Sequence, residues 1–254
     1  MKLNFRSIGY GPPLLILHGL LGSLDNWVPQ AQLLAAHFQV LLPDLRNHGR
    51  SPHAAEFDHE VMVADIVELI QDQNLGQVSV LGHSLGGKVA MRLAQLHPDK
   101  VRRLVVVDIA PREDPPRYAD ILTAMQRLDL HQFQRREQVN AALFSADPEK
   151  RLRQFLLKNL GRDDAGGLYW KPNLAAIAAG YVNACRALPT GSSCRVPTLF
   201  VRGGKSDYLR EEDAVLIQRM LPESQMTTLA AAGHWVHADA PEEFRHVVTA
   251  FLLG

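Results

Sequence analysis

Short apolar runs recur along the chain, and segments with helical periodicity separate most of them. Each apolar run has the length of a buried strand, whereas the segments between them repeat their apolar positions every three to four residues. Strands that alternate with helices in this way predict a parallel, doubly wound α/β sheet. The expected strands are 14–17, 40–42, 78–81, 104–107, 198–201 and 226–229, and the expected helices include 61–73, 88–96 and 211–221.

The stretch 112–194 departs from this rhythm, because it shows no clear buried strand. We therefore expect an α/β core formed by residues 1–111 and 195–254, over which residues 112–194 form an inserted helical cap. This cap is rich in arginine, which is typical either of a solvated surface or of an anion-binding rim. Its helical patterns cover 118–128, 135–144 and 149–160.

The composition is that of an ordinary globular protein of 254 residues, with 46% apolar residues. Because 27 lysines and arginines balance 27 aspartates and glutamates, neither nucleic acid nor an anionic membrane is indicated as a partner. The chain begins without an apolar leader and has no run of membrane-spanning length, so we expect a cytoplasmic protein. Cys185 and Cys194 lie outside any zinc spacing; free thiols are expected, and a local disulfide stays open.

The expected strand 78–81 leads directly into the sequence Gly-His-Ser-Leu-Gly at 82–86, and a helical pattern follows. A Gly-x-Ser-x-Gly sequence between a strand and a helix is typical of a nucleophile elbow, in which the serine occupies a strained turn. Glycines are needed on both sides because larger side chains would collide with the strand and the helix. Ser84 is therefore the candidate nucleophile, and an ordinary strand-to-helix loop is the alternative.

A serine hydroxyl is a poor nucleophile unless a neighbouring base takes its proton. His234 is the candidate base, because it follows the last expected strand and a glycine, in the chain order nucleophile first and histidine last. His237 is the fallback. A metal site formed by these two histidines is a third interpretation, which we disfavour because no Asp/His cluster with ligand spacing accompanies them. No metal is expected.

Two carboxylates are placed to orient such a histidine. Asp108 ends the strand 104–107, and Asp207 follows the strand 198–201. Carboxyl ends of parallel strands meet at one edge of the sheet, so either side chain can reach the imidazole Nδ1. Each can instead be a helix cap or a turn residue, and these patterns leave the choice open.

Backbone amides are expected to stabilise the oxyanion that develops during acyl transfer. The turn His18–Gly22 follows the first clear strand, and its glycine lets the Leu20 N–H point into the site. The Leu85 N–H follows the nucleophile at a helix N-terminus and is the second expected donor. A simple β-turn is the alternative for His18 and Gly19.

Together these segments resemble the α/β-hydrolase superfamily over nearly the whole chain, and more narrowly the YbfF-type bacterial esterases, relatives of the animal hydrolase ABHD11. The resemblance implies that Asp108 is the acid and that Ser206 supports the histidine as a fourth member. In most α/β hydrolases the acid stands where this chain has Ser206, and Asp207 falls one residue later. The matching segments are 18–20, 22–27, 43–51, 82–88, 107–111 and 233–237.

The residues and the resemblance predict a serine hydrolase that cleaves carboxylic esters or acyl thioesters through an acyl-enzyme. The relatives imply short to medium acyl groups, including acyl-CoA, as small-molecule substrates, and no cofactor. A C–C bond hydrolase and a cofactor-free perhydrolase use the same triad and are alternatives, as is a non-catalytic small-ligand receptor. A haloalkane dehalogenase is disfavoured because it needs a carboxylate where this chain has Ser84. The oligomeric state is not indicated.

Overall fold

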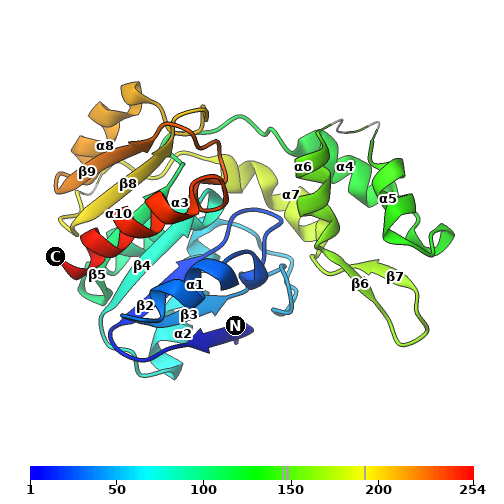
Figure 1. Ribbon diagram of the computed structural model, residues 1–254, viewed down its shortest axis with the longest axis horizontal. Helices are drawn as coiled ribbons and strands as arrows, with labels where there is room; N and C mark the ends of the chain where they lie inside the picture. Colours follow the sequence, from blue (N-terminus) through cyan, green and yellow to red (C-terminus); the bar gives the residue numbers. More distant parts are fainter. Residues whose placement is uncertain (145, 147–148, 192) are drawn as a thin grey trace.

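A seven-stranded sheet organises the computed structural model, which describes residues 1–144, 146, 149–191 and 193–254 (Figure 1). The strand order is β1-β3-β2-β4-β5-β8-β9, and every neighbouring pair is parallel except β1 with β3. The mostly parallel sheet with flanking helices confirms the predicted fold class. The strands are β1 (Phe5–Ile8), β2 (Pro13–Leu17), β3 (Gln39–Pro43), β4 (Val78–His83), β5 (Val101–Val107), β8 (Thr198–Gly203) and β9 (Ser224–Leu229).

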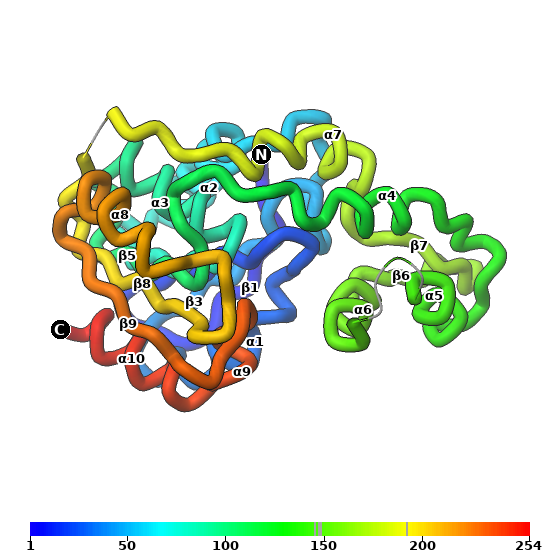
Figure 2. Tube along the Cα trace, turned by 90° about the horizontal axis from the view of Figure 1, so that it is seen from above, coloured from blue at the N-terminus to red at the C-terminus, as the bar shows by residue number. Residues whose placement is uncertain are grey.

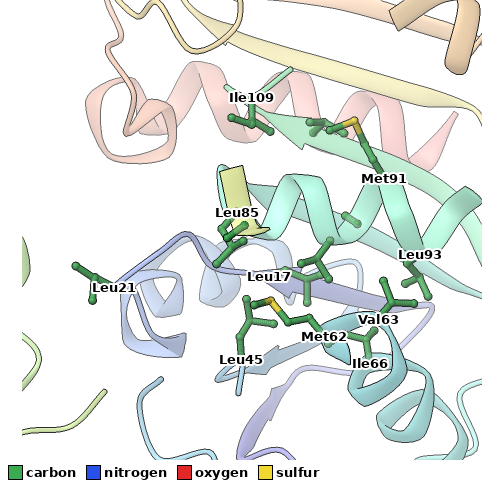
Figure 3. Packing of buried hydrophobic residues seen from close by; sticks show 14 of the residues in the cluster. Leu17, Leu21, Leu45, Met62, Val63, Ile66, Leu85, Met91, Leu93 and Ile109 are labelled. Atoms are coloured by element: carbon green, nitrogen blue, oxygen red, sulfur yellow. The ribbon is translucent and has the colours of Figure 1, made fainter. Parts of the chain in front are cut away.

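Helices cover both faces of the sheet, because each strand alternates its side chains between two apolar clusters. On β2, Leu14 and Ile16 pack with α1, α9 and α10, whereas Leu15 and Leu17 pack with α2, α3 and α8. Figure 3 shows the second cluster, in which Leu17 lies close to the side chains of α2 and α3. These helices are α1 (Val28–Leu34), α2 (His59–Asp72), α3 (Leu85–Leu96), α8 (Ala214–Met220), α9 (Val236–Asp239) and α10 (Pro241–Leu253).

Residues of the expected cap form helices and one hairpin, which project beyond the sheet in both views (Figures 1 and 2). The helices are α4 (Ala119–Arg127), α5 (Arg136–Ala142), α6 (Lys150–Leu157) and α7 (Leu174–Cys185), and the hairpin strands are β6 (Leu160–Arg162) and β7 (Leu168–Trp170). Short 3-10 helices complete the described elements: η1 (Leu24–Asn26), η2 (Pro98–Lys100), η3 (Leu130–Gln132) and η4 (Glu211–Asp213). The bounds of the cap as a separate domain stay a prediction.

Three elements differ from the sequence-based expectation. β1 is an edge strand that lacks a buried run, so its pattern gave no signal. α7 is alanine-rich and apolar on most sides, which hides the helical period. The expected helix 149–160 ends at Leu157, because Leu160 already pairs with Trp170 in the β6–β7 hairpin. No helix in the described ranges is both long enough and apolar enough to cross a bilayer.

Candidate active site

Ser84 occupies the sharp turn between β4 and α3. Its backbone has φ 52° and ψ −120°, a conformation that is strained for a residue with a side chain. The Ser84 N–H donates a hydrogen bond of 3.1 Å to the Val107 carbonyl on the neighbouring strand. A side chain at Gly82 would collide with the Gly86 carbonyl, and one at Gly86 would collide with the Leu17 carbonyl. The two glycines therefore allow the turn that presents the serine.

Asp108 lies at the end of β5 and hydrogen-bonds directly to the His234 imidazole. The distance between Asp108 Oδ2 and His234 Nδ1 is 2.8 Å, and Asp108 is fully buried. Its Oδ1 accepts a hydrogen bond of 2.9 Å from the Gly203 N–H, while Ser206 Oγ donates to Oδ2. The carboxylate is thus fixed by three donors, which come from two neighbouring strand ends and the loop that precedes α9.

Asp207 points away from this cluster. Its side chain is 58% exposed and pairs with Arg117, with 2.8 Å between Oδ2 and Nη2. The hydrogen bond from Arg117 lowers the pKa of the Asp207 carboxyl. Of the two carboxylates that the sequence left open, only Asp108 contacts the imidazole of His234.

His237 lies one turn after His234, but its ring stacks on Trp27 with 4.0 Å between centroids. Burial lowers the pKa of His237 to about 3, so its imidazole stays neutral near neutral pH. Its Nδ1 has no hydrogen-bond partner among the described residues. Within the same residues, no group of three or more His, Cys, Asp or Glu side chains is arranged to hold a metal ion.

Two side chains that the sequence did not single out contact the base. His83, the residue before the nucleophile, donates from Nε2 to the His234 carbonyl at 2.9 Å. Burial holds the pKa of His83 well below its usual range, so it remains a neutral donor. Tyr208 stacks on the His234 ring, with 3.8 Å between centroids and 19° between planes. Only the positions of these residues next to Ser84 and Asp207 hinted at a role.

The loop after β2 places the Leu20 N–H beside Ser84, and it is held from both sides. The Leu21 N–H donates to His48 Nε2 at 3.1 Å, and the Leu21 carbonyl accepts from Asn159 Nδ2 at 2.7 Å. Leu20, Ser84 and Leu85 line one small cavity. In the described part of the chain, neither the Leu20 nor the Leu85 N–H donates a hydrogen bond. Both amides are available to a bound oxyanion.

Ser84 and His234 line a second small cavity together with Gly19 and Leu20. No hydrogen bond joins the Ser84 hydroxyl to His234 among the described contacts. Such bonds are often long before substrate binds and shorten in the reacting complex. The arrangement brings nucleophile, base, acid and amide donors to one edge of the sheet, as acyl transfer requires.

Comparisons with known proteins agree with this geometry. Residues 12–241 match the family described as alpha/beta hydrolase fold. The sn-1-specific diacylglycerol lipase ABHD11 of Mus musculus is 37% identical over 250 residues, covering 95% of this chain and 81% of the relative. The esterase YbfF of Escherichia coli (strain K12) is 30% identical over 260 residues, covering 99% of both chains. A solved structure titled "Marine microorganism esterase" is 40% identical, with a TM-score of 0.96, over 98% of this chain and 99% of that chain.

Proposed function

The chain belongs to the alpha/beta hydrolase fold family, and we propose that it is a serine esterase that works through an acyl-enzyme. The resemblance to YbfF-type esterases and to ABHD11 is confirmed by the matches at 30% and 37% identity. The observation that carries the proposal is the 2.8 Å contact between the buried Asp108 and His234, at the edge of the sheet where the strained Ser84 turn lies.

In the proposed first step, Ser84 Oγ attacks the carbonyl carbon of the ester while His234 Nε2 takes the hydroxyl proton. The carbonyl oxygen becomes an oxyanion, which accepts hydrogen bonds from the Leu20 and Leu85 amides. When the tetrahedral intermediate collapses, the bond from carbon to the leaving oxygen breaks. His234 returns its proton to that oxygen, so an alcohol departs and the acyl group stays on Ser84.

In the proposed second step, a water molecule replaces the alcohol. His234 takes a proton from the water as it attacks the acyl carbon, and the same two amides hold the second oxyanion. Collapse of this intermediate breaks the bond to Ser84 Oγ, which receives the proton from His234. The products are a carboxylic acid and the free enzyme, and the step needs no cofactor.

Asp108 is proposed to hold the tautomer in which His234 Nδ1 carries the proton, which leaves Nε2 free to act as the base. Its negative charge also stabilises the imidazolium that forms while His234 holds the serine proton. Ser206 donates to the same carboxylate oxygen that His234 contacts. It is therefore proposed as a positioning residue, which keeps Asp108 in place without contact to substrate.

Carboxylic esters are favoured over acyl-CoA thioesters by the charges at the mouth of the site. Arg117 and Arg151 line the wide hollow beside His234, but each is paired with a carboxylate, Asp207 or Asp239. Their charge is already balanced, so the hollow offers little attraction to phosphates. Thioesters, C–C hydrolysis and perhydrolysis on the same triad, and a receptor role have no comparable observation in their favour. A cytoplasmic location stays a prediction.

The test is hydrolysis of 1-naphthyl acetate by the purified protein and its Ser84→Ala variant. Loss of a triad nucleophile lowers turnover by several orders of magnitude, so we expect the variant to fall close to background. Ser224→Ala, a serine on the edge strand β9, is the matched control and should retain full activity. Activity that survives in Ser84→Ala, or its absence from the wild-type protein on any ester, contradicts the proposal.

A further inference from the structure

Two hollows of very different size adjoin the two halves of the candidate site. The small one has a volume of ≈40 Å³ and is lined by Ser84, Leu20 and Leu85, without His234. The large one has a volume of ≈440 Å³ and is lined by His234, without Ser84. Between them, a hollow of ≈30 Å³ is lined by both Ser84 and His234. The site therefore has a narrow side at the nucleophile and a wide side at the base.

The chemistry of ester cleavage assigns one half of the substrate to each side. The acyl carbon bonds to Ser84 and its oxygen points to the Leu20 and Leu85 amides, so the acyl chain extends from these three residues. The leaving oxygen receives its proton from His234, so the alcohol must lie beside that residue. This assignment rests on the function proposed above. We infer that the protein selects esters with a short, uncharged acyl group and a large alcohol.

The walls of the narrow side limit the length of the acyl chain. Ile109, at the end of β5, and Tyr181, Ala184 and Cys185, on α7, are all less than 9% exposed and line the hollow. Figure 3 shows Ile109 and Leu85 on neighbouring elements, at the ends nearest the site. A volume of ≈40 Å³ has room for about three water-sized groups. An acetyl to butyryl group fits this space, whereas an octanoyl chain is longer than it.

A buried ion pair at the base of the narrow side resists its enlargement. Lys88 Nζ lies 2.8 Å from Asp114 Oδ2 and donates to the carbonyls of Arg112, Cys185 and Arg186, each at 2.9 Å. These partners belong to the two chain segments that lead into and out of the expected cap. Widening the hollow would separate these segments and break a network that is shielded from water.

The same network explains why the acyl group should carry no charge. Lys88 is 1% exposed, and its ammonium group already has four oxygen partners. It has no donor left for a carboxylate on the substrate. The other side chains that line the hollow are mostly apolar or aromatic. An acyl chain that ends in a charge would therefore lose its hydration without gaining a partner.

The test compares 1-naphthyl acetate, butyrate and octanoate, which share one large alcohol. For the wild-type protein we expect kcat/KM to fall by about tenfold or more between butyrate and octanoate, because a chain that exceeds its pocket is rejected at this scale. Ala184→Val narrows the hollow and should lower turnover of butyrate relative to acetate by a similar factor. Ile109→Ala widens it and should raise the ratio of octanoate to acetate. Ala179→Val, the same substitution on an exposed position of α7, should leave all ratios unchanged.

A second series keeps the acetyl group and varies the alcohol from methyl to naphthyl. The ratios within this series should not respond to Ala184→Val or Ile109→Ala, because neither residue lines the wide hollow. Octanoate turned over as fast as butyrate, or variants that change both series equally, would overturn the inference. If hydrolysis still depends on Ser84 in that case, the proposed esterase function stands. If hydrolysis is absent or independent of Ser84, both fail.

Discussion

The carboxylate of Asp207 lies 2.8 Å from the guanidinium of Arg117 and is turned away from His234. Arg117 also lies over the ring of Tyr208, which stacks on His234. The chain thus uses two adjacent residues differently: Asp207 faces the surface, while Tyr208 covers the imidazole. The carboxylate that reaches the imidazole is Asp108, from another strand end.

Replacement of these two carboxylates should therefore have unequal effects. Asp108→Asn removes the charge beside His234 and disfavours its working tautomer, so turnover should fall on the order of a thousandfold or more. Asp207→Asn should change turnover little, because its side chain forms an exposed ion pair. Ser206→Ala should be intermediate. Steady-state rates on one ester decide it; a crippled Asp207→Asn beside a near-normal Asp108→Asn would show that the acid is misassigned.

The two histidines of the last loop should also separate. His234→Ala should abolish turnover, since His234 alone of the two contacts Asp108. His237→Phe retains an aromatic ring over Trp27 and should keep most of the activity. Rates on 1-naphthyl acetate, with circular dichroism to confirm folding, measure the difference. Equal losses in both variants would contradict the role given to His234.

Removing Lys88 should destabilise the fold. Lys88→Met leaves the buried Asp114 without its ammonium partner, which should lower the free energy of unfolding by about 3–5 kcal/mol. The exposed Lys205→Met is the matched control and should cost less than about 0.5 kcal/mol. Urea unfolding of both variants measures these values. Similar stability of the two would mean that the Lys88 network does not hold the chain segments together.

Stability should decline in mild acid because several histidines are buried in neutral form. Burial lowers the pKa of His59 to about 4 and that of His18 to about 4. Between pH 6.5 and 4 the unfolded chain binds protons that the folded protein does not, so the free energy of unfolding falls as pH falls. Each such histidine contributes up to about 1.4 kcal/mol per pH unit.

A single substitution isolates this effect. His59→Gln should flatten the pH dependence of the unfolding free energy between pH 6.5 and 4 by up to that amount. The exposed His37→Gln serves as the control. Urea titrations at several pH values give the slopes. An unchanged slope in His59→Gln would show that this histidine is not held neutral by the fold.

The six expected strands and the Ser84 turn follow from local pattern, and the structure contains all of them. Buried parallel strands are continuous apolar runs, and the elbow needs glycines at fixed places, so both leave a signal in the sequence. The direction of Asp207 leaves none, because it depends on Arg117, which is 90 residues away along the chain. The contacts of Tyr208 and His83 with His234 likewise join segments that only the fold brings together.

The most direct test of the account is the site of covalent modification by a fluorophosphonate, which reacts with an activated serine. Intact mass should show one adduct on the wild-type protein, and peptide mapping should place it on Ser84. Ser84→Ala and His234→Ala should not be modified at this rate, whereas Ser224→Ala should react like the wild type. An adduct on another serine, or rapid modification that persists in Ser84→Ala together with ester hydrolysis, would contradict the account.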